Sequence, residues 1–187
     1  INKWGKCRTG AITMYGAGVG VYGNSGYAYT GSTPSKLKKR IEEANSSNAE
    51  ITDINITENG NYVIILGGSG YWTLGYPDAF LKKLEQYRTG DLRDDNILSA
   101  CFNDRGEWVV ITDKHYSYSN ETIKNFILKA EELYEEVYYA YITNYGMIAC
   151  CKNGVYYKNI PSNLAEALKK LTFKPKVIKF TDNGLYL

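Results

Sequence analysis

The chain has 187 residues, of which 44% are hydrophobic and 22% are charged, and its net charge is +2. This length and composition allow one domain with a substantial hydrophobic core. The small net charge does not indicate a nucleic-acid partner, and no apolar run approaches the roughly 20 residues that a membrane-spanning helix requires. We therefore expect neither a nucleic-acid partner nor a membrane span.

A repeated unit is the main feature of the sequence. Turn glycines recur at spacings of 44, 46, 40 and 38 residues, at Gly16, Gly60, Gly106, Gly146 and Gly184. A period of this length is typical of one supersecondary unit per copy. We predict a single repeat domain over residues 1–187, with units at about 1–50, 51–96, 97–136 and 137–176 and a half unit at 177–187.

The first unit is irregular, because Gly18 and Gly20 stand where later units carry large apolar residues. The segment from Gly18 to Gly23 spells G-x-G-x-x-G, which in dinucleotide-binding proteins follows a strand and opens a helix. The repeat places this segment inside a strand instead. We therefore interpret these glycines as positions that allow close backbone approach at one end of the array.

The second unit shows the pattern most clearly, with two apolar strands around Asn59-Gly60, then Tyr71-Trp72 and a helix after Pro77. Asn-Gly is typical of a two-residue type I′ hairpin turn. That turn would place Ile54, Ile56, Val63 and Ile65 on one sheet face. The corresponding residues of the next two units are also apolar: Ala100, Phe102, Val109, Ile111, Ala140, Ile142, Ala149 and Cys151. We expect the helices to cover this face.

The later units complete the predicted fold. In the third unit an apolar stripe follows the expected helix cap Asn120, and consists of Ile123, Phe126, Ile127, Ala130, Leu133 and Tyr134. The half unit contains Asn183-Gly184 and is typical of a hairpin without a helix. We predict an α+β fold of tandem hairpin, short strand and helix repeats, with four full units and a terminal half unit. The array forms either an open curved stack or a closed ring, in which the half unit pairs with the N-terminal strand.

The opposite sheet face is unusually apolar for a face that alternation should make polar. It carries Tyr62, Ile64, Trp108, Val110, Ile148 and Cys150. Either the array curls or dimerises over these side chains, or they form an aromatic binding strip. A second row of aromatic residues follows the hairpins, and the chain has 18 tyrosines and three tryptophans in total. These rings either pack at the junction between hairpin and helix or contact a ligand. The candidate binding residues are Tyr62, Tyr71, Trp72, Trp108, Tyr116, Ile148, Tyr156 and Tyr157.

Catalytic and metal-binding patterns are weak. His115 is the only histidine, so a Cys-His pair is formally possible, but it occupies a turn position and no third orienting group is evident. The four cysteines lack C-x-x-C spacing, which argues against a zinc site. Cys101 and Cys150 fall on the same face of neighbouring units, which permits a disulfide without requiring one. We expect no catalytic residue, no metal and no cofactor.

The order of an I-x-x-I-x-[IF] strand, an Asn-Gly turn, an aromatic-Val-Ile strand, Gly-Tyr-Trp and a Pro-led, Leu-rich helix resembles tandem repeats of secreted or modular bacterial proteins of poorly known function. The resemblance covers nearly the whole chain and implies a bacterial extracytoplasmic protein. A start at Ile1 instead of Met is consistent with removal of a leader.

From these observations we expect a non-catalytic secreted interaction module that binds a protein or a glycan. The alternatives are a structural subunit that forms homo-oligomers through its terminal strand, and a cysteine/histidine hydrolase.

Overall fold

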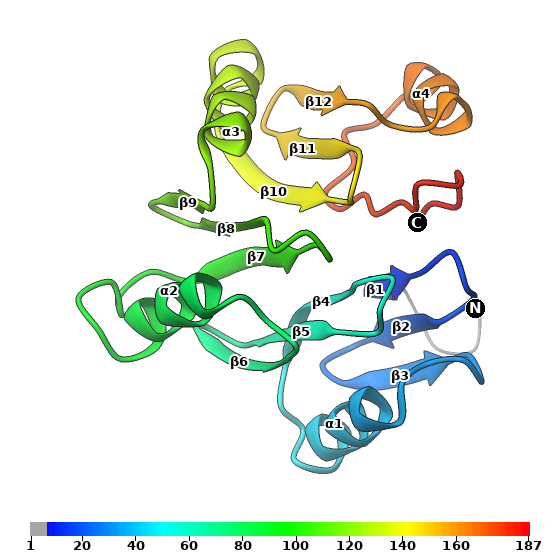
Figure 1. Cartoon of the computed structure of the whole chain (residues 1–187), viewed down its shortest axis with the longest axis vertical. Helices are drawn as coiled ribbons and strands as arrows, with labels where there is room; N and C mark the ends of the chain where they lie inside the picture. The colour runs from blue at the N-terminus through cyan, green and yellow to red at the C-terminus, as the bar shows by residue number, and fades with distance from the viewer. Residues whose placement is uncertain (1–6) are drawn as a thin grey trace.

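The computed structural model describes residues 7–187 and shows a repeated α+β architecture (Figure 1). Each unit is a three-stranded antiparallel sheet followed by a helix. The first two units contain β1 (Cys7–Ile12), β2 (Gly18–Tyr22), β3 (Gly26–Tyr29), α1 (Ser35–Ser46), β4 (Ile51–Ile56), β5 (Tyr62–Leu66), β6 (Gly70–Leu74) and α2 (Asp78–Arg88). The next two contain β7 (Ile97–Phe102), β8 (Trp108–Thr112), β9 (Tyr116–Tyr118), α3 (Glu121–Tyr134), β10 (Val137–Ile142), β11 (Met147–Cys151), β12 (Gly154–Lys158) and α4 (Ser162–Lys169).

The predicted fold class is confirmed, and the four sheets remain separate instead of closing into a barrel. In the terminal half unit, Phe180 and Tyr186 form an isolated antiparallel bridge, so residues 177–187 form a hairpin, called here the terminal hairpin. The part of the predicted first unit before residue 7 lies outside the described residues. Within residues 7–187, no helix has the length and apolar character needed to cross a membrane.

The hairpin register differs from the prediction by one residue. Ile56 pairs with Tyr62 and Ile54 with Ile64, so the loop holds the five residues 57–61. The Thr57 N–H donates to the Asn61 carbonyl at 2.8 Å, and Gly60 has a φ of +80°. A type I′ turn needs positive φ at both central residues, and Asn59 does not adopt it. The predicted two-residue turn is therefore wrong, and the shift places Val63 and Ile65 on the face opposite Ile54 and Ile56.

The same correction applies to the third unit, whereas in the fourth unit the predicted set Ala140, Ile142, Ala149 and Cys151 does share one face. Phe102 pairs with Trp108, so Ala100 and Phe102 share a face with Trp108 and Val110, while Val109 and Ile111 lie on the other face. In the fourth unit the loop is one residue shorter, and Ile142 pairs with Met147. Ile148 and Cys150 consequently lie on the face that corresponds to Val109 and Ile111, and not on the face of Trp108.

Each of the first three helices lies between two neighbouring sheets, which explains why both sheet faces are apolar. α2 buries Phe80, Leu84 and Tyr87 against Val63 and Ile65 of its own sheet and against the next sheet. The Phe80 ring lies 5.2 Å from that of Phe102 and 5.9 Å from that of Trp108, measured between centroids. The helix of the preceding unit therefore covers the sheet face that the sequence left unexplained.

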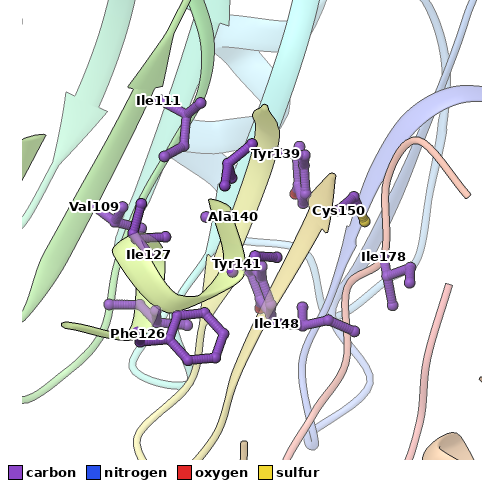
Figure 2. Packing of buried hydrophobic residues seen from close by; sticks show 14 of the residues in the cluster. Val109, Ile111, Phe126, Ile127, Tyr139, Ala140, Tyr141, Ile148, Cys150 and Ile178 are labelled. Carbon is purple, nitrogen blue, oxygen red and sulfur yellow. The ribbon is translucent and has the colours of Figure 1, made fainter. Parts of the chain in front are cut away.

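α1 and α3 occupy equivalent positions. α1 buries Leu37, Ile41 and Ala44 in one cluster with residues of β2 and β5. Figure 2 shows Phe126 and Ile127 of α3 beside Val109 and Ala140, which belong to successive sheets. The Asn120 side chain accepts the Ile123 N–H at 3.0 Å, which confirms the predicted cap. Leu133, predicted to belong to the apolar stripe, is instead 50% exposed at the end of the helix.

Candidate functional site

A buried polar cluster lies among the first strands of the sheets, which face the middle of the molecule (Figure 1). Each of these strands carries a β-bulge after its first residue. The residue that follows each bulge occupies an equivalent position and is at most 4% exposed: Thr9, Asp53, Ser99 and Tyr139. A bulge re-aims the next side chain, so the repeats bring these groups together.

Lys179 of the terminal hairpin enters this cluster and forms a buried ion pair with Asp53. Its Nζ lies 2.7 Å from Asp53 Oδ1 and 3.3 Å from Thr9 Oγ1, and it also donates to the Ile54 carbonyl. Both charged side chains are 1% exposed. Burial lowers the pKa of Lys179, and the charge of Asp53 and its hydrogen bond to Lys179 oppose that effect. The pair joins the last unit to the first two units.

This contact decides how the chain ends meet. The terminal hairpin pairs with itself, since the Leu187 N–H donates to the Lys179 carbonyl at 2.9 Å. No backbone hydrogen bond between the terminal hairpin and β1 occurs within the described residues. The predicted ring closure by strand pairing is therefore not found. The ends of the curved array instead meet through side chains, and they lie side by side in Figure 1.

A groove of about 430 Å³ separates the terminal hairpin from the first sheet, and we call it the seam groove. Its lining includes Gly10, Val19, Gly20 and Tyr22 of the first sheet and Val177, Lys179 and Leu187 of the terminal hairpin. Helices α1, α2 and α3 separate the successive sheets, and Leu164 of α4 packs with Ile178 and Phe180 of the terminal hairpin. Within residues 7–187, no helix lies at the seam between the terminal hairpin and the first sheet.

Gly10 and Gly20 line the seam groove at positions where a larger side chain would fill it. An ideal Cβ added to Gly10 would lie 2.7 Å from the Val19 carbonyl oxygen and 3.2 Å from Leu187 Cδ1. At Gly20 the nearest atom is the Tyr22 hydroxyl, at 3.1 Å. The G-x-G-x-x-G segment begins in strand β2 and leads to β3, as the repeat predicted, so it does not open a helix. The glycines keep the surface of β1 and β2 open at the place where other sheets meet a helix.

Exposed apolar side chains gather at the same end of the chain. Five of the large hydrophobic residues that are at least 36% exposed fall in the last 17 residues: Leu171, Phe173, Leu185, Tyr186 and Leu187. Large exposed apolar patches commonly mark interaction sites. The seam groove, which Leu187 lines, is therefore the best candidate binding surface.

The predicted aromatic sheet face is not available as a surface. Tyr62 is 4% exposed, Trp108 is 6% exposed and Ile148 is fully buried. The first two lie under the helix of the preceding unit, and Ile148 is in the core beside Ile178 (Figure 2). A ligand could reach these three side chains only if the units separated.

The second aromatic row is half-buried and engaged within its own units. Tyr29, Tyr71 and Tyr116 each donate a hydrogen bond to a glutamate of the following helix, and the Tyr116–Glu131 distance is 3.0 Å. Burial and Glu131 raise the pKa of Tyr116 to about 12. The Tyr156 ring packs 5.0 Å from that of Phe126. The binding role of Tyr71, Trp72, Tyr116, Tyr156 and Tyr157 stays a prediction.

His115 has an orienting group that the sequence did not reveal. Its Nδ1 lies 2.5 Å from Asp95 Oδ2, and Thr112 Oγ1 lies 3.2 Å from the same carboxylate oxygen. The two partners are 20 residues apart, across a loop, so no short motif joins them. Within the described residues, no contact joins His115 to a cysteine.

The cysteine environments do not favour a nucleophile. All four are free thiols, so the possible Cys101–Cys150 disulfide is not formed in this structure. Burial raises the pKa of Cys101 and of Cys150 to about 12 and that of Cys151 to about 11. Reactive thiols need a lowered pKa. Cys7 is exposed and lines the seam groove.

The pH dependence of stability tests the Asp95–His115 contact. Burial acts to raise the pKa of Asp95, but hydrogen bonds and charge from His115, with Thr112 and Lys114, lower it overall. Its stabilising contribution is therefore present above the unfolded value near 3.8 and is lost as pH falls below it. We expect Asp95→Asn to reduce the free energy of unfolding by about 1–3 kcal/mol at neutral pH. Urea denaturation at several pH values should show this deficit shrinking as pH falls below about 4; a constant deficit would contradict the assignment.

Comparison with protein-family models found no match, and comparison with curated proteins found no significant similarity.

Proposed function

We propose that this chain is a non-catalytic interaction module that binds an amphipathic helix of a partner protein in the seam groove. The observation that carries the proposal is the seam groove. It lies beside the first sheet at the position where, between the successive sheets, a helix is packed. Helix-in-groove binding is a common mode of peptide recognition, and it uses apolar residues spaced along one helix face.

The chain's own helices indicate what such a partner helix would carry. α1 buries Leu37, Ile41 and Ala44, and α2 buries Phe80, Leu84 and Tyr87. Both sets follow an i, i+4, i+7 spacing. A ligand with three apolar side chains at that spacing matches the apolar groove, whose volume lies within the range of ordinary ligand pockets. Secretion by a bacterium stays part of the proposal, on the resemblance alone.

Binding of helical peptides tests the proposal directly. A fluorescence-polarisation screen would use labelled helices with apolar residues at i, i+4 and i+7, and scrambled sequences as the reference. Gly20→Val fills the seam groove, and the side chain it displaces is the end of Tyr22. We expect this variant to weaken the best binder at least tenfold, since about 1.4 kcal/mol suffices for that change.

Matched controls separate the seam groove from other surfaces. Gly31→Val makes the same change where an added Cβ meets no atom within 4 Å, and we expect it to leave binding unchanged. Trp72→Ala tests the outer aromatic row, and we expect at most a small effect. If Trp72→Ala abolishes binding and Gly20→Val does not, the aromatic row is the site. If no helical peptide binds better than its scrambled version, the proposal is wrong.

A second candidate function is self-association through the same end of the chain. The exposed side chains of Leu171, Phe173 and Leu185 to Leu187 favour it. Light scattering coupled to size-exclusion chromatography distinguishes the two functions. A monomer across a wide concentration range favours a foreign ligand, and a dimer that Leu187→Asp dissociates favours a second copy.

A further inference from the structure

A second cavity lies where the hairpin loops of the later units meet the terminal hairpin, and we call it the loop cavity. Its volume is about 20 Å³. This is enough for one water molecule or one metal ion. Its polar lining includes Asn55, Thr57, Glu58, Asp104, Asn144 and Asp182.

The repeat brings one acidic or amide side chain to this place from each of the second, third and fourth units and from the terminal hairpin. Glu58, Asp104, Asn144 and Asp182 each follow the first residue of a hairpin loop. Hydrogen bonds join successive loops: the Met14 N–H donates to Glu58 Oε2 at 2.8 Å, and Asn103 Nδ2 donates to the Thr143 carbonyl at 2.9 Å. The loops are thus held around one point.

The lining of the loop cavity carries negative charge and contains no cationic side chain. Three carboxylates line the loop cavity, and none of the residues that line it is lysine, arginine or histidine. A bound cation would balance carboxylates that lack a cationic partner in the lining.

Buried oxygen atoms without partners supply an independent observation. Asn55 is 4% exposed and Thr57 is 7% exposed, yet Asn55 Oδ1 and Thr57 Oγ1 have no hydrogen-bond partner among residues 7–187. The Asn55 amide donates to Asp53 and to the Ala100 carbonyl, which leaves Oδ1 as a free acceptor. Asp104 Oδ1 and Asn144 Oδ1 are also buried and unpartnered. Unsatisfied buried acceptors are rare in native structures, and a bound ion or an ordered water accounts for them.

Thr57 differs from its counterparts in the other loops. The Thr143 and Thr181 hydroxyls accept backbone N–H groups of their own loops, at 2.9 Å from Gly146 and 3.1 Å from Leu185. The Thr57 hydroxyl makes no such bond and lines the loop cavity instead. Four unpartnered oxygens thus surround one small, negatively charged space.

We propose that the loop cavity binds a hard divalent cation of the calcium class. The ligands are Asn55 Oδ1, Thr57 Oγ1, Asn144 Oδ1 and Asp104 Oδ1, and Glu58 and Asp182 supply further negative charge around the ion. Calcium accepts amide, hydroxyl, carboxylate and water oxygens in flexible geometry. Within residues 7–187, no three His, Cys, Asp or Glu side chains form a metal-binding group, so neutral oxygens supply most of the ligands. The site is separate from the seam groove, and its test does not depend on helix binding.

Calcium titration of the full chain tests the proposal. After treatment with a chelator, Ca²⁺ at about 100 times its dissociation constant should raise the Tm by roughly 5–10 °C. Sodium chloride at equal ionic strength should not reproduce the shift. Tb³⁺, a luminescent substitute for Ca²⁺, should bind and be sensitised by Tyr141, which lines the loop cavity. Excess Ca²⁺ should displace it.

Variants locate the ion. Asp104→Asn should weaken Ca²⁺ binding at least tenfold, and Thr57→Val should weaken it several-fold while keeping the side-chain shape. Asp91→Asn makes the same charge change at an exposed loop residue and should bind as the unmodified chain does. If Asp104→Asn does not fold, Asp182→Asn replaces it. A sodium effect equal to that of calcium, or equal binding by Asp104→Asn and Asp91→Asn, would overturn the proposal.

Discussion

Replacing Lys179 with alanine is expected to lower the free energy of unfolding by about 3–5 kcal/mol. The change removes one partner of an ion pair in which both side chains are 1% exposed. The Asp53 carboxylate would then remain buried with only neutral donors, from Thr9, Asn55 and the backbone of Ile54 and Ala100. The cost arises mainly from the unpaired charge, and not from the lost attraction.

Two controls make this expectation specific. Lys169→Ala breaks an exposed pair with Glu166, whose side chains are 63% and 60% exposed, and should change the free energy of unfolding little. The double variant Lys179→Met and Asp53→Leu removes both charges and should recover most of the stability. Urea denaturation monitored by tryptophan fluorescence gives the free energy of unfolding of all three variants. A loss for Lys179→Ala no larger than that for Lys169→Ala would show that the pair does not hold the chain ends together.

Replacing Phe80 with alanine is expected to cost about 3–5 kcal/mol. The Phe80 side chain is fully buried in α2, between the second and third sheets, and its ring contacts those of Phe102 and Trp108. Its removal leaves a cavity at the contact between two units, so the apolar transfer term and the cavity term add. In a repeat protein, this interface also couples the folding of neighbouring units.

The matched control is Phe173→Ala, because Phe173 is 66% exposed and the same atoms are removed. We expect a cost below about 0.5 kcal/mol for that variant. Urea denaturation of both variants gives the comparison, and hydrogen exchange shows whether the second and third sheets open separately in Phe80→Ala. A cost for Phe80→Ala close to that for Phe173→Ala would contradict the placement of α2 between two sheets.

Several elements could be predicted because their signals are local. The recurring glycines indicate the period, and Asn120 marks the start of a helix whose cap the structure confirms. The apolar spacing of Ile123, Phe126 and Ile127 predicts the buried helix face. The hairpin of the half unit also follows from its own residues.

The register could not be obtained in this way. Asn59-Gly60 resembles a two-residue turn, but the five-residue loop 57–61 makes its own hydrogen bonds and needs positive φ only at Gly60. A difference of one residue reverses which face each side chain occupies. Both faces of each sheet carry apolar residues, so either register predicts an apolar face that a helix could cover.

The repeated α+β unit follows from the sequence, because turn residues and apolar spacing act over a few neighbouring residues. Three features depend on the packing of whole units: each of the first three helices contacts two sheets, Lys179 pairs with Asp53 across 126 residues, and no helix of residues 7–187 lies in the seam groove. These features depend on how successive units rotate and stack. Small differences in rotation between successive units accumulate along the array, so local sequence patterns do not predict how the two ends meet.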